Sequence, residues 1–140
     1  MSSSPSGERK PSVSEWVLDA SALLAFIKDE PGAGQVMESL AEEAFIGAVN
    51  LAEVVSKLVD DGWAEPGIHA AIATSLTEVI SLDEETAYEA GLLRGHTRHA
   101  GLSLGDRACL ALARRLGAPV LTADRSWQQL DVGVRIVLIR

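Results

Sequence analysis

SLGDRACLALA, residues 103–113, is a strongly apolar run that carries one carboxylate, Asp106, near its start. On a helix Asp106 shares a stripe with Leu110 and Ala113, so it faces the same way as the expected core side chains. Ser103 and Asp106 also have the spacing of a capping box, and an acid in the first turn complements the helix dipole by about 0.3–1 kcal/mol. The run therefore predicts a buried helix whose first acid either caps the helix or serves a site.

Strand-like and helix-like segments alternate on both sides of this run. The expected strands are Glu15–Leu18, Ala44–Val49, Val79–Leu82, Val120–Thr122 and Arg135–Ile139. The expected helices are Ser21–Lys28, Ala33–Glu42, Leu51–Asp61, Glu65–Thr77, Glu84–His99, Leu104–Leu116 and the short Arg125–Leu130. This alternation predicts an α/β fold with a mainly parallel sheet of roughly five strands.

Composition narrows the class of protein. The chain has 140 residues, 47% of them hydrophobic, which suits one domain with an aliphatic core. We expect residues 1–14, rich in Ser, Pro and charge, to be a disordered tail before a domain spanning residues 15–140. A lone cysteine, Cys109, excludes a disulfide framework and fits a cytoplasmic protein. No apolar run reaches the ~18 residues that span a bilayer, so we expect no membrane partner.

The net charge of −8 argues against a protein that coats nucleic acid by bulk electrostatics, because such proteins are basic. An acidic protein that handles phosphate groups needs local help, most simply from bound cations.

Three more acids stand where an element is expected to begin or end. Asp19 and Asp124 each follow a strand and can cap the next helix, and Asn50 followed by Glu53 has the spacing of a cap and its third-position acid. Glu53 also precedes Lys57 by four residues, a favourable pair on a helix. Because Glu53 faces away from the centre of its helix's apolar stripe, it is physically the weakest site candidate.

Local capping does not explain why the four acids share one region of the expected fold. Parallel strands joined by right-handed crossovers end at one edge, and open α/β sheets bind ligands there. Two carboxylates about 4 Å apart repel by about 4 kcal/mol at an effective dielectric near 20. The grouping therefore predicts either retained protons or a bound cation. Oxygen donors favour Mg²⁺ or Mn²⁺, and such an ion can drive phosphodiester hydrolysis.

Four stretches resemble, in order, the acidic motifs of PIN-domain nucleases. They are VLDASALLA (17–25), NLAEV (50–54), LSLGDRACLALA (102–113) and LTADRSW (121–127). Their order and spacing are similar to those of VapC-like toxins of type II toxin–antitoxin pairs, over about residues 15–140. The resemblance implies a three-layer α/β/α sandwich and a Mg²⁺-dependent endoribonuclease in which Mn²⁺ can substitute.

The resemblance also implies roles for residues. Asp19, Glu53, Asp106 and Asp124 match the acidic quartet of the family. In such proteins the metal rests on the first and third acids, the fourth acts through a water or a second ion, and the second orients a water or a metal. Ser21 and Thr122 match small hydroxyl positions near the site. RNA as substrate, a cognate antitoxin and a homodimer are expected on the same ground.

Two other classes of function stay open at this stage. One is a non-catalytic PIN-like partner-binding domain whose acids only cap helices. The other is a phosphotransfer domain, which lacks support because Asp19-Ala20-Ser21 has no second Asp and Thr122-Ala123-Asp124 has no Lys.

Four further side chains have two interpretations each. Arg107 and Arg125 can be phosphate contacts or, more commonly, surface charges. Trp127 can stack a base but more simply packs in the core, and Cys109 is expected to be a small core residue.

Overall fold

The computed structural model describes residues 15–140, and the expected tail at residues 1–14 lies outside that range. The strands are β1 (Glu15–Leu18), β2 (Glu43–Gly47), β3 (Glu78–Ile80), β4 (Val120–Thr122) and β5 (Ile136–Leu138). The α-helices are α1 (Ala20–Ile27), α2 (Ala33–Leu40), α3 (Ala48–Asp60), α4 (Glu65–Ser75), α5 (Glu84–Thr97) and α6 (Leu104–Leu116). Two 3₁₀ turns, η1 (Arg98–Ala100) and η2 (Arg125–Gln129), complete the order of elements.

The five strands form one sheet in the order β3-β2-β1-β4-β5, and every neighbouring pair is parallel. The chain winds outward from β1 to β3 and then returns to place β4 on the other side of β1. The winding direction therefore reverses between β1 and β4, which is the point of an open α/β sheet where ligands bind. The predicted α/β fold with a parallel sheet is confirmed.

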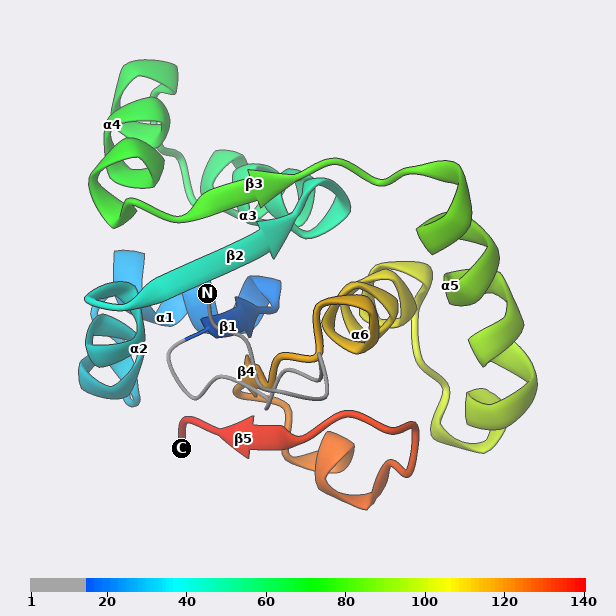
Figure 1. Cartoon of the computed structure of the whole chain (residues 1–140). Coiled ribbons are helices and arrows are strands. Elements are labelled where there is room, and N and C mark those ends of the chain that lie inside the picture. Colours follow the sequence, from blue (N-terminus) through cyan, green and yellow to red (C-terminus); the bar gives the residue numbers. More distant parts are fainter. Residues whose placement is uncertain (1–14) are drawn as a thin grey trace, which may run out of the picture.

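Two hydrophobic cores lie on opposite faces of the sheet. Successive strand residues point to opposite faces, so Val17 and Val120 join the core beneath α5 and α6, while Leu18 and Leu121 join the core beneath α1–α4. Figure 1 shows α5 and α6 packed side by side, away from α1 and α2. The arrangement is the predicted α/β/α sandwich. The first core includes Cys109 and Trp127, 0% and 1% exposed, which confirms both as packing residues.

Two expectations about local structure are wrong. The strand β2 ends at Gly47 and α3 starts at Ala48, so Asn50 lies in the first turn of α3 and does not cap it. Arg107 is neither a surface charge nor a phosphate contact, because α5 covers this side of α6. Its guanidinium is buried and donates through Nη1 to the carbonyl oxygen of Ala90 at 2.9 Å. Among residues 15–140, no helix is long and apolar enough to cross a membrane.

A glycine at the start of α2 provides a test of the packing. Gly32 has φ +98° and an added Cβ would lie 2.6 Å from the carbonyl oxygen of Ile139. We expect Gly32→Ala to lower the free energy of unfolding by at least about 1 kcal/mol, because the left-handed conformation alone costs an L-residue ~1–2 kcal/mol. Urea denaturation followed by circular dichroism measures the change.

The matched control is Gly34→Ala in the same helix, where an added Cβ meets nothing within 4 Å. We expect this variant to gain up to ~1 kcal/mol from helix propensity. Equal effects of the two substitutions would contradict the packing described for Gly32.

Candidate active site

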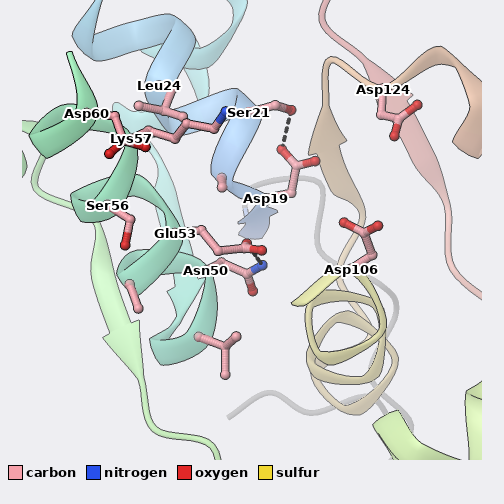
Figure 2. Close-up of a pocket in the computed structure, with 13 residues that line it drawn as sticks. Asp19, Ser21, Leu24, Asn50, Glu53, Ser56, Lys57, Asp60, Asp106 and Asp124 are labelled. Carbon is pink, nitrogen blue, oxygen red and sulfur yellow. Dashed lines mark hydrogen bonds between the residues drawn. The ribbon is translucent and has the colours of Figure 1, made fainter. Parts of the chain in front are cut away.

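A cavity of about 560 Å³ opens at the carboxyl edge of the sheet, beside the β1–β4 switch point. All four predicted acids line it. The full lining is Asp19, Ala20, Ser21, Leu24, Val49, Asn50, Ala52, Glu53, Ser56, Lys57, Asp60, Asp106 and Asp124. In Figure 2 the carboxylates of Asp19, Glu53 and Asp106 surround a common space, and Asp124 lies beyond them on the β4 side. The fold thus brings together acids that are widely separated in the sequence.

Asp19 directly follows β1 and is the N-cap of α1. Its Oδ1 accepts hydrogen bonds from the Ala22 backbone N–H at 2.9 Å and from Ser21 Oγ at 2.7 Å. Its Oδ2 accepts one from Thr122 Oγ1, at the end of β4, at 2.5 Å. The residue is only 6% exposed, and three donors, two from the first turn of α1 and one from the end of β4, hold its carboxylate in one orientation. Ser21 and Thr122, which the resemblance places near the site, thus both contact Asp19.

The environment of Asp19 disfavours its ionised form. The pKa of Asp19 is raised from 3.8 to about 6, chiefly by burial and in smaller part by the negative charge of Asp106, while the hydrogen bonds from Thr122, Ser21 and Ala22 oppose the shift. A buried carboxyl group beside a second acid is the kind of group that a cation would stabilise.

Asp106 and Asp124 each cap a helical element and also line the cavity. Asp106 Oδ2 accepts from the Ser103 backbone N–H at 3.0 Å, and Ser103 Oγ accepts from the Asp106 N–H at 3.1 Å, which completes the capping box of α6. Asp124 caps η2 by accepting from the N–H of Ser126 at 3.0 Å. Because both acids also line the cavity, capping fixes where their carboxylates lie but is not their only contact with the rest of the site.

Glu53 reaches the cavity through a contact that the sequence reasoning missed. Asn50, 1% exposed, donates through Nδ2 to Glu53 Oε1 at 2.9 Å and to the carbonyl oxygen of Gly105 at 3.1 Å. Its Oδ1 has no partner within the described part of the chain. Glu53, the weakest candidate on sequence grounds, lines the cavity with the other three acids. The helix α3 begins three residues earlier than predicted, and its first turn lies against α6.

The donor chemistry fits a hydrated divalent ion. Among residues 15–140, no three acidic, histidine or cysteine side chains stand close enough together to hold an ion directly. In the same range, however, one oxygen each of Glu53, Asp106 and Asp124 accepts no hydrogen bond, while both oxygens of Asp19 do. Because Mg²⁺ retains several of its waters in proteins, free carboxylate oxygens around one cavity can bind it through those waters.

The chain matches a known domain family and curated relatives over most of its length. The profile of the PIN domain matches residues 16–133. This chain belongs to the PIN domain family. Ribonuclease VapC30 of Mycobacterium tuberculosis is 31% identical over 126 residues, which cover 83% of this chain and 95% of the relative. Ribonuclease VapC of Mycolicibacterium smegmatis is 28% identical over 125 residues, which cover 83% and 96%.

The fold of this PIN domain also matches solved structures. VapBC2 from Rickettsia felis, in a crystal structure with a DNA fragment from its promoter, gives a TM-score of 0.71 at 18% identity and covers 89% of this chain and 98% of that one. The VapC-like PIN resemblance inferred from the four motifs is therefore confirmed.

Several residues that line the site of this PIN domain were missed from the sequence. Lys57 and Asp60 extend the cavity along α3, and Asn50 and Gly105 contact Glu53. One signal was available, since a glycine inside a helical pattern costs about 1 kcal/mol relative to alanine and so calls for a reason such as packing. The lining by Lys57 and Asp60 has no such signal, because it depends on how α3 lies across α1.

The buried carboxyl group of this PIN domain predicts a pH dependence of stability. Between the ordinary pKa of 3.8 and the folded value of about 6, the folded state binds more protons than the unfolded state. The contribution of Asp19 to the free energy of unfolding therefore falls as pH rises through this interval and is constant above it. For metal-free protein, Asp19→Asn should remove this penalty and be more stable than the wild type at pH 8, by on the order of 3 kcal/mol.

Urea denaturation in EDTA at pH 4 and pH 8 measures the difference between the two proteins. Contributions of acids that do not interact with Asp19 cancel in that difference. Parallel stability curves for wild type and variant would contradict the raised pKa.

Proposed function

We propose that this PIN domain is a Mg²⁺- or Mn²⁺-dependent endoribonuclease and the toxin of a type II toxin–antitoxin pair. The observation that carries the proposal is the meeting of Asp19, Glu53, Asp106 and Asp124, from four separate elements, in one cavity at the β1–β4 switch point. Its resemblance to VapC ribonucleases supports the reaction class.

The charge of the cavity supports a cation. Five acidic side chains and one basic side chain, Lys57, line it. A phosphodiester entering this cavity meets like charge on most sides, at a cost of about 4 kcal/mol for each pair of charges 4 Å apart at an effective dielectric near 20. A divalent cation offsets that repulsion and lets one site accept both the carboxylates and the phosphate.

Each acid has a distinct place in the proposed reaction. Asp19 and Asp106 would hold the ion, Asp124 would support it through a water, and Glu53 would orient the attacking water. The ion, when bound, would polarise a phosphoryl oxygen, acidify a water and offset the charge on the leaving oxygen. The hydroxyls of Ser21 and Thr122 keep Asp19 in place by donating to its two oxygens.

An antitoxin and a second copy of this chain are the proposed protein partners. A toxin–antitoxin complex from Klebsiella pneumoniae contains a chain of the same fold, with a TM-score of 0.69. Helices α2 and α3 carry the exposed apolar side chains Met37 and Val59, 58% and 57% exposed, that such partners would cover. RNA is the proposed substrate.

Cleavage of total RNA tests the proposal. Purified protein with Mg²⁺ should cut RNA, EDTA should stop it, and Asp106→Asn should lower the rate at least about 100-fold, since even outer-shell partners of a metal contribute 10–100-fold. The matched control is Asp131→Asn, the same change at an exposed acid outside the cavity, which should retain the wild-type rate. Mapping the cut ends identifies the bond. A wild-type rate for Asp106→Asn would remove this residue from the catalytic set.

Titration with Mn²⁺ separates the nuclease from the non-catalytic alternative, a partner-binding domain whose acids only cap helices. Calorimetry should find a Mn²⁺ site in the wild type and in Asp131→Asn, and the site should be absent in Asp19→Asn. Equal binding by all three proteins, or binding by none, favours the partner-binding domain.

A further inference from the structure

Gly105 lies in the second position of α6, where no turn requires a glycine. Its φ is not in the left-handed region, so conformational freedom does not account for it. Lack of space for a side chain accounts for the glycine. An added Cβ would lie 2.8 Å from Cδ and 3.0 Å from Oε1 of Glu53, with Oε2 nearer still. Ordinary van der Waals contact begins at 3.4 Å. The Glu53 carboxylate therefore occupies the volume that any other residue at position 105 would fill.

A hydrogen bond from Asn50 holds the carboxylate in that volume. Its amide group donates to Glu53 Oε1 and to the Gly105 carbonyl oxygen, so it joins the first turns of α3 and α6 across 55 positions of sequence. Both of these interactions use Nδ2, and the buried Oδ1 is left without a partner among residues 15–140. An arrangement that leaves a buried acceptor unsatisfied is better explained by positioning Glu53 than by stability.

We propose that Gly105 and Asn50 are positioning residues that fix the Glu53 carboxylate beside Asp106. Asp106 directly follows Gly105 in the first turn of α6. The missing side chain of Gly105 lets the carboxylate approach the helix, and the Asn50 amide keeps it there. This inference rests on the proposed nuclease function for its catalytic consequence, and the contact geometry can be tested without it.

The substitution that tests this is Gly105→Ala. Its Cβ must displace the Glu53 carboxylate by about 1 Å, and misplacements of that size can lower a rate by about 100-fold. We expect kcat for RNA cleavage to fall by about that factor while the melting temperature is unchanged or higher, since alanine favours a helix. The matched control is Gly91→Ala in α5, where an added Cβ meets nothing within 4 Å; it should keep the wild-type kcat.

A double substitution tests whether Gly105 acts through Glu53. In the Glu53→Ala background no carboxylate remains to be displaced, so adding Gly105→Ala should cause no further loss of rate. A general structural role would instead lower the rate by the same factor in both backgrounds, and this result would overturn the proposal.

A readout independent of cleavage uses metal-free protein. The ¹H and ¹⁵N resonances of the Asn50 side-chain amide report its hydrogen bond to Glu53. They should shift in Gly105→Ala and stay unchanged in Gly91→Ala. An unmoved Asn50 amide together with a wild-type kcat would overturn the inference. If the wild type cuts no RNA, the nuclease proposal fails, and the Asn50 resonances alone decide whether Gly105 positions Glu53.

Discussion

The hydrogen bond from Thr122 to Asp19 joins the carboxyl ends of the central strand β1 and its neighbour β4. The other three acids lie around this junction. The two residues are 103 positions apart and meet only because the sheet places β4 beside β1. Ser21 strengthens the junction, since its Oγ donates to Asp19 and also accepts from the Ala123 backbone N–H at 2.9 Å. The order of the strands thus fixes the position of the Asp19 carboxylate.

Helix capping also fixes the positions of Asp106 and Asp124. A cap is a short-range interaction, yet α1 and α6 both begin at the same edge of the sheet, so their caps converge. The positive ends of these two helices offset part of the repulsion between Asp19 and Asp106. One set of hydrogen bonds therefore starts the helices and restrains the side chains that face the cavity.

Features set by local sequence were predictable, and features set by packing between elements were not. The bounds of α6 and β4 agree with the expected Leu104–Leu116 and Val120–Thr122, because capping, periodicity and turn residues define them. The convergence of the acids followed from a general rule for parallel sheets. The start of α3 was placed too late, since β2 runs into the helix without a side-chain cap. That error misassigned Asn50 as the cap of the helix.

Long-range contacts account for the remaining differences. Arg107 has the hydrophilic character of a surface residue, but α5 covers it and supplies a carbonyl acceptor at Ala90. The fit of Glu53 against Gly105 depends on the distance between α3 and α6, which no pattern within either segment encodes.

The burial of Cys109 has a practical consequence for work on this protein. Desolvation, together with the charges of Asp19, Asp106 and Glu53, raises the pKa of its thiol well above the ordinary value. Thiolate is the reactive form, so this thiol is inert toward maleimides and iodoacetamides in the folded state. A cysteine introduced on the surface can therefore carry a fluorophore or spin label at a single position, with the native cysteine left in place.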